Sequence, residues 1–112
     1  MGASVALVEV WLREWFPDAT IESERIGRVP DLSLTQTVDD ERNEYFLFRV
    51  TRPGRAQLHI GASRLALEQL SESELQDGIR LVVDQATTGA YEDDLVILTI
   101  WHGIVHEKKG KR

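Results

Sequence analysis

Two stretches of alternating side chains, joined by the segment TRPGR, constrain the fold most strongly. The apolar faces of these stretches are formed by Phe46, Phe48 and Val50 and by Ala56, Leu58 and Ile60. Strict alternation is typical of a half-buried strand, and Pro-Gly marks a turn. We therefore predict an antiparallel hairpin in which Val50 faces Ala56, Phe48 faces Leu58 and Phe46 faces Ile60.

Two further strands are predicted ahead of this hairpin. Residues 20–26 form a weak strand that ends at Gly27. The segment DLSLTQTVDD, residues 31–40, alternates more clearly, with Leu32, Leu34 and Val38 on one face. The turn DDERN then leads into the hairpin, so the strands form an antiparallel meander.

Helical periodicity marks two other segments. The first, Ser4–Phe16, has Ser4 as its N-cap and ends before Pro17. The second begins at Ser71, which has capping-box spacing to Glu74, and finishes near Gly89. Its apolar stripe is Leu75, Ile79, Val82, Val83 and Ala86, and only Leu81 points away from it. Residues 63–70 fit either a short helix capped by Ser63 or an extended segment.

The last segment, Leu95–Val105, is apolar on both faces, which is typical of a covered central strand. A crossover through the preceding helix would insert it parallel to a neighbour. These elements predict an α+β fold: a two-layer domain with a mostly antiparallel meander sheet of about five strands, the last strand central. The N-terminal helix and the helix before the last strand pack on the sheet.

The length of 112 residues fits one globular domain, residues 1–107, followed by a disordered basic tail, residues 108–112. There is no cysteine, which excludes disulfides, thiolate metal sites and cysteine nucleophiles and fits a reducing cytoplasm. No apolar run reaches the roughly 18 residues of a membrane span, and the amino end lacks the features of a signal peptide. We therefore expect a cytoplasmic protein.

The charge distribution favours a basic partner. Four of the 13 basic residues lie in the last five positions, so residues 1–107 hold 9 basic against 19 acidic residues, a net charge of −10. Such a body repels a phosphate backbone. Two acidic clusters, Asp39, Asp40 and Glu41 and then Glu92, Asp93 and Asp94, are either docking groups for basic residues or solvated turns. Neither has the spacing of an EF-hand loop.

Fingerprints of catalysis and cofactor binding are absent. The chain contains no G-x-S-x-G elbow, no P-loop and no G-x-G-x-x-G segment. We therefore assign no catalytic, cofactor-binding or metal-binding residue and no cofactor, and we expect a protein that is not an enzyme.

The histidines are a weak candidate ligand site. His102 and His106 have the i, i+4 spacing that chelates a metal on a helix. On the strand predicted here they would lie about 13 Å apart, too far to share one zinc ion. A small-ligand or metal module that uses these two residues and His59 stays an alternative hypothesis.

Three arginines, Arg49, Arg52 and Arg55, lie on the outer face and turn of the predicted hairpin. Together with the basic tail they offer a further alternative, a nucleic-acid-binding regulator. The acidic excess makes nucleic acid a weak hypothesis, because the arginines also suit ion pairs with neighbouring carboxylates.

The first helix carries an apolar arc of about 180°, wider than the roughly 100° that one interface requires. Trp11 and Trp15, four residues apart, are typical of core packing against a sheet, which is the default interpretation. Leu7 and Trp11 nevertheless lie toward an edge of this arc, so the alternative is that Trp15 lies inside the core and Trp11 at a rim. Surplus apolar surface suits a partner site or a homodimer through this helix. The favoured interpretation is a small acidic protein-interaction domain, of inhibitor, immunity or scaffolding type, that binds a basic protein.

Overall fold

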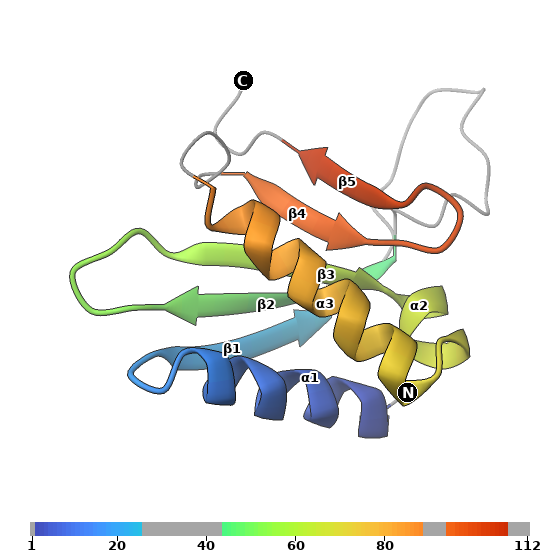
Figure 1. Ribbon diagram of the computed structural model, residues 1–112, viewed down its shortest axis with the longest axis horizontal. Coiled ribbons are helices and arrows are strands. Elements are labelled where there is room, and N and C mark those ends of the chain that lie inside the picture. The colour runs from blue at the N-terminus through green and yellow to red at the C-terminus, as the bar shows by residue number, and fades with distance from the viewer. Residues whose placement is uncertain (1, 26–43, 89–93, 108–112) are drawn as a thin grey trace.

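The computed structural model describes residues 2–25, 44–88 and 94–107 (Figure 1). Their elements follow the order α1 (Gly2–Trp15), β1 (Thr20–Arg25), β2 (Tyr45–Thr51), β3 (Leu58–Ser63), α2 (Arg64–Gln69), α3 (Glu72–Ala86), β4 (Leu95–Leu98) and β5 (Ile104–Glu107). The predicted strand 31–40, the Gly89 cap and the tail 108–112 lie outside the described residues.

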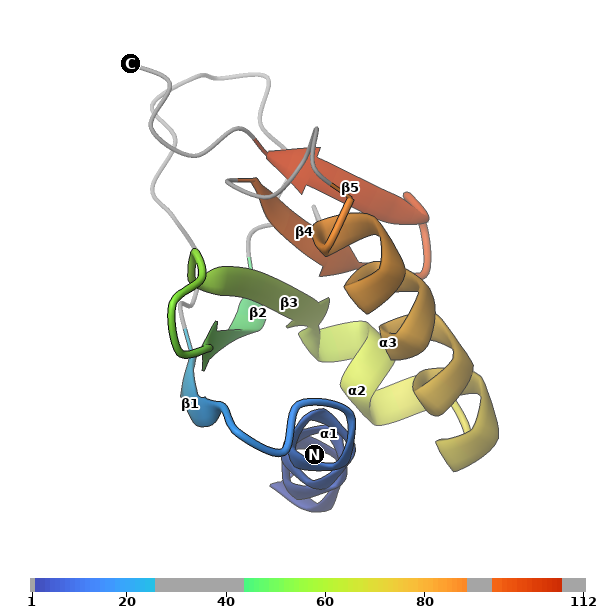
Figure 2. The same ribbon diagram turned by 60° about the vertical axis from the view of Figure 1, so that its left-hand side comes forward.

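The five strands form one mixed sheet in the order β1-β2-β3-β4-β5. Among the strands within the described ranges, only the β3–β4 pair is parallel, and the α2–α3 segment makes the connection between these two strands. Figure 2 shows the three helices on one side of the sheet, which gives the two-layer α+β fold that the sequence predicts.

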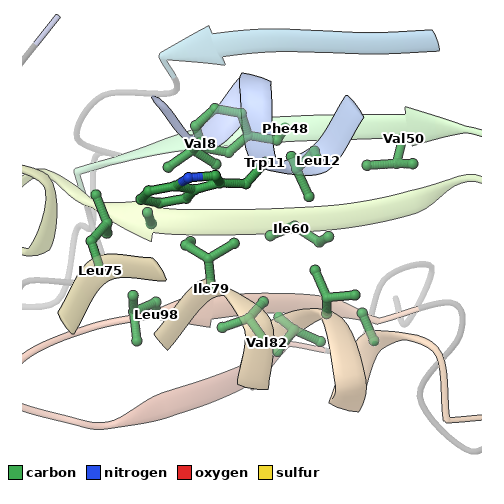
Figure 3. Packing of buried hydrophobic residues seen from close by; sticks show 14 of the residues in the cluster. Val8, Trp11, Leu12, Phe48, Val50, Ile60, Leu75, Ile79, Val82 and Leu98 are labelled. Atoms are coloured by element: carbon green, nitrogen blue, oxygen red, sulfur yellow. The ribbon is translucent and has the colours of Figure 1, made fainter. Parts of the chain in front are cut away.

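The core lies between the helices and the sheet (Figure 3). All five members of the predicted α3 stripe are buried, which confirms the helical period of this segment. From the sheet, alternate residues of β2 and β3 meet them, with Phe48 and Ile60 fully buried. Burying such a side chain contributes about 1.5–3 kcal/mol, so this layer is the main source of stability.

The hairpin register differs from the prediction by two residues. Val50 lies opposite Leu58, Phe48 opposite Ile60, and Phe46 opposite Ala62. Because side chains alternate with a period of two, this shift leaves the residues within β2 and β3 on their predicted faces. Ala56, which was predicted on the apolar face, instead lies in the connection before β3 and is exposed. The reason is a longer connection: residues 52–57 contain the RPGR turn, and β3 begins only at Leu58.

The expectation of one long central strand over Leu95–Val105 was wrong. β4 ends at Leu98, and the chain turns back so that β5 forms the edge of the sheet. In the turn, Thr99 donates its backbone N–H to the carbonyl of Gly103 at 2.9 Å, and its hydroxyl accepts from the N–H of His102. Gly103 has φ +68°, a conformation that glycine adopts without strain. The apolar pattern hid this turn because Ile100 and Trp101 continue it.

Side-chain caps set the starts of α2 and α3. The Ser63 hydroxyl accepts the Ala66 N–H, so residues 63–70 contain a short helix. Ser71 and Glu74 form the predicted capping box, with bonds of 3.2 and 3.0 Å. Ser4, in contrast, lies inside α1, which begins two residues earlier at Gly2.

A charged bracket joins β1, β2 and α2. Glu44 pairs with Arg25 at 2.9 Å and with Arg64, whose backbone N–H donates to the Glu44 carbonyl. Burial alone would raise the pKa of Glu44, but the charges and hydrogen bonds of the two arginines outweigh it and lower the pKa. The bracket therefore holds the start of β2 against the end of β1.

Candidate functional site

Of the two tryptophans of α1, Trp11 lies in the core as the core-packing interpretation predicts, and the alternative that places Trp11 at a rim was wrong. Trp11 is 5% exposed and belongs to the core cluster, whereas Trp15 is half-buried beneath the guanidinium of Arg80, 5.0 Å from the ring centroid. The wide apolar arc of α1 is covered on several sides, because α1 packs on the sheet and also on α2 and α3. Leu7 is half-buried against the same core. Trp11 is therefore not exposed to form the homodimer contact that was expected through Leu7 and Trp11.

The acidic clusters give no docking surface among the described residues. Asp39, Asp40, Glu41, Glu92 and Asp93 lie outside those residues. Asp94 is described, and its side chain is buried at the start of β4. Asp94 is thus not available to a partner at the surface.

The three histidines are not brought together. His59 is buried on β3, His102 is exposed in the β4–β5 turn, and His106 lies on β5. The strand pairing places His106 opposite core-facing Val96, and its Nε2 hydrogen-bonds to the side-chain oxygen of Gln85 on α3. His59 points to the other face of the sheet, because it alternates with buried core residues of β3. In the three described ranges, no group of three or more His, Asp or Glu residues could hold a metal ion.

The three arginines of the β2–β3 hairpin lie in two different environments. Arg49 on β2 forms a 2.7 Å ion pair with Glu24 of the neighbouring strand. Arg52 and Arg55 belong to the β2–β3 turn and line a pocket with the end of α1. The three side chains therefore do not form one basic surface of the kind that a nucleic-acid backbone requires.

A stripe on the outer side of α3 combines carboxylates with one exposed apolar side chain. This stripe, here the α3 outer stripe, consists of Glu74, Asp77, Leu81 and Asp84. Their spacings of three and four residues place them along one line of the helix surface. Leu81 is 54% exposed, and all three acidic residues are exposed around it. Arg80 lies at the edge of the stripe, 3.8 Å from Asp84.

The pocket between α1 and the β2–β3 turn has a volume of about 310 Å³. Residues 15–19 form one wall, and Arg52, Pro53 and Arg55 form the other. Figure 1 shows the two turns at the same end of the sheet. The sequence offered a partial signal, since both walls contain a proline turn, but the segments are more than thirty residues apart and nothing local indicates that they meet.

Comparison of the chain with protein-family models, with curated proteins and with solved structures finds no match. Within the described residues, no helix combines the length and apolar character needed to cross a membrane. The geometry of the α3 outer stripe and of the pocket is therefore the basis for any functional conclusion.

Proposed function

We propose that this chain is a non-catalytic protein-interaction domain that binds a basic partner through the α3 outer stripe, as a small inhibitor or scaffold would. The observation that carries the proposal is Leu81, a large apolar side chain exposed between Asp77 and Asp84 on a well-formed helix. A partner helix with one apolar residue among lysines and arginines is complementary to this arrangement.

The two kinds of residue have different roles in binding. Leu81 supplies apolar area at the centre of the contact, where burial gives most of the affinity. The carboxylates around it remain at the rim, where charges mainly speed association and select the partner. The described residues contain 13 acidic against 7 basic side chains, so this part of the molecule attracts a cation over a longer range.

The distribution of charge favours the α3 outer stripe over a nucleic-acid site at the arginines as the binding surface. Arg25 and Arg49 of the sheet and Arg64 of α2 already pair with glutamates, which reduces the attraction of this surface for a polyanion. Helix α3 carries four exposed carboxylates, at Glu72, Glu74, Asp77 and Asp84, against the single arginine at position 80. The stripe thus combines an excess of negative charge with an apolar centre.

A defined probe tests the stripe before a natural partner is known. We expect a helical peptide of leucine and lysine to shift the amide resonances of residues 74–84 and to bind more weakly as salt rises from about 50 to 500 mM. Asp77→Lys should weaken binding about tenfold or more. Glu22→Lys on the exposed strand β1 is the matched control, because it changes the net charge equally. If both variants weaken peptide binding equally, the effect comes from overall charge alone, and the α3 outer stripe is not the binding site.

The apolar part of the proposal has its own test. Leu81→Ser should weaken the same peptide about tenfold while leaving the stability of the fold nearly unchanged, since the side chain is more than half exposed. Capture from the native cell with wild type, Leu81→Ser and Glu22→Lys should then recover a basic protein with the first and third baits only. Recovery of the same protein by all three baits would show that the α3 outer stripe is not its binding site.

A further inference from the structure

We propose that the pocket between the end of α1 and the β2–β3 turn binds a small carboxylate with an aromatic or apolar body. This site is separate from the α3 outer stripe and does not depend on it. Two guanidinium groups, one carboxylate and two aromatic rings line a single hollow of about 310 Å³. That volume is at the lower end of ligand pockets and suits a molecule of amino-acid size better than a nucleotide.

Both walls of the pocket are proline turns, which makes the site preformed. In the first wall the Ala19 N–H donates to the Phe16 carbonyl at 3.0 Å across Pro17. In the second wall the Arg55 N–H donates to the Arg52 carbonyl at 3.2 Å. There Pro53 is followed by Gly54 with φ +67°, the arrangement of a type II turn. Turns fixed in this way lose little conformational entropy when a ligand binds.

The cationic wall is also positioned by contacts outside the turn. The Arg52 guanidinium lies over the Phe16 ring, 5.9 Å from its centroid, and its Nη2 donates to the Ala56 carbonyl at 3.1 Å. Arg55 is exposed beside it at the rim. Two planar, permanently charged donors at one wall match the geometry of a carboxylate.

The charges in the pocket define the class of ligand. Arg52 and Arg55 give a local positive charge in a chain whose formal net charge is −6. Asp18 offsets one of these charges, which suits a single carboxylate better than a phosphate group. The same Asp18 offers a partner for an ammonium group, so an aromatic amino acid would use the whole site. Trp15, Phe16 and the two prolines would receive its ring.

Three probes separate the parts of this proposal: phenylalanine, N-acetylphenylalanine, which lacks the ammonium group, and phenethylamine, which lacks the carboxylate. We expect phenylalanine to shift the amide resonances of residues 15–19 and 52–55 with millimolar affinity. Phenethylamine should bind at least tenfold more weakly. Absence of saturable binding by either carboxylate below about 20 mM, or equal binding of phenethylamine, would overturn the proposal.

Matched variants locate the binding. Arg55→Gln should weaken both carboxylates about tenfold, whereas Arg13→Gln, which removes the same charge from an exposed position of α1, should not. Asp18→Asn should weaken phenylalanine alone if a free amino acid is the ligand. If N-acetylphenylalanine binds as tightly as phenylalanine and Asp18→Asn affects neither, the carboxylate comes from the end of a peptide. Equal loss in the Arg13 and Arg55 variants would contradict the site.

Discussion

The burial of Trp11 leads to a strong prediction about stability. Replacing Trp11 by alanine should destabilise the fold by about 3–5 kcal/mol, the usual range for a large aromatic residue in a core. A buried aromatic side chain removes roughly 150–250 Å² from water, and at about 25 cal/mol per Å² this area is worth about 4–6 kcal/mol. The remaining exposure of 5% hardly reduces that figure.

Such a loss is large for a domain of this size, because natural domains are stable by only about 5–15 kcal/mol. Urea unfolding followed by circular dichroism measures it without relying on tryptophan emission. Trp11→Phe keeps most of the apolar volume and should lose less than half as much, which keeps the test usable if the alanine variant does not fold. Leu81→Ala is the exposed control and should stay within about 0.5 kcal/mol of wild type. A Trp11→Ala protein within about 1 kcal/mol of wild type would refute the placement of Trp11 in the core.

Three smaller perturbations test the local structure. Ser71→Ala removes the acceptor for the Glu74 N–H and should cost about 1 kcal/mol in thermal or urea unfolding, while Ser71→Thr should cost much less. Gly78→Ala places a Cβ 2.7 Å from Cδ2 of Leu98, so it should destabilise the fold by about 1 kcal/mol despite the better helix propensity of alanine. In a Leu98→Ala background the same change should become stabilising, and an unchanged sign would refute the contact. Glu44→Gln should cost up to about 1 kcal/mol at pH 7. Because the folded pKa of Glu44 is lowered, its contribution is present above the ordinary value of 4.5 and is lost as pH falls through the folded value. The two proteins should thus converge in stability in acid, and a gap that persists there would contradict the charged bracket.

The sequence predicts the fold class and most element types because local periodicity reports which face of each element is buried. The α3 stripe and its capping box follow directly from spacing, and the alternation in β2 and β3 identifies the correct faces. The hairpin register could not be derived in the same way. A shift of two residues keeps the strand side chains on the same faces of the sheet. Only the geometry of the RPGR connection decides whether Val50 pairs with Ala56 or with Leu58.

The candidate sites depend more on tertiary contacts. The sequence shows that α1 is apolar over a wide arc, but the packing of α2 and α3 against α1 decides that Trp11 is covered. The turn at Gly103 was hidden by the apolar residues before it, and it separates His102 from the strand that carries His106. The pocket joins residues 15–19 with the β2–β3 turn, and no local pattern indicates that contact. In contrast, Leu81 already departs from the apolar stripe of its helix in the sequence, and it is exposed in the structure.

The central claim is that the α3 outer stripe receives a basic partner. Its most direct test is the affinity of the leucine–lysine peptide for Asp77→Lys compared with Glu22→Lys, measured by titration calorimetry at one salt concentration. We predict that the α3 variant binds about tenfold more weakly than the β1 variant, although both carry the same net charge. Indistinguishable affinities would contradict the claim.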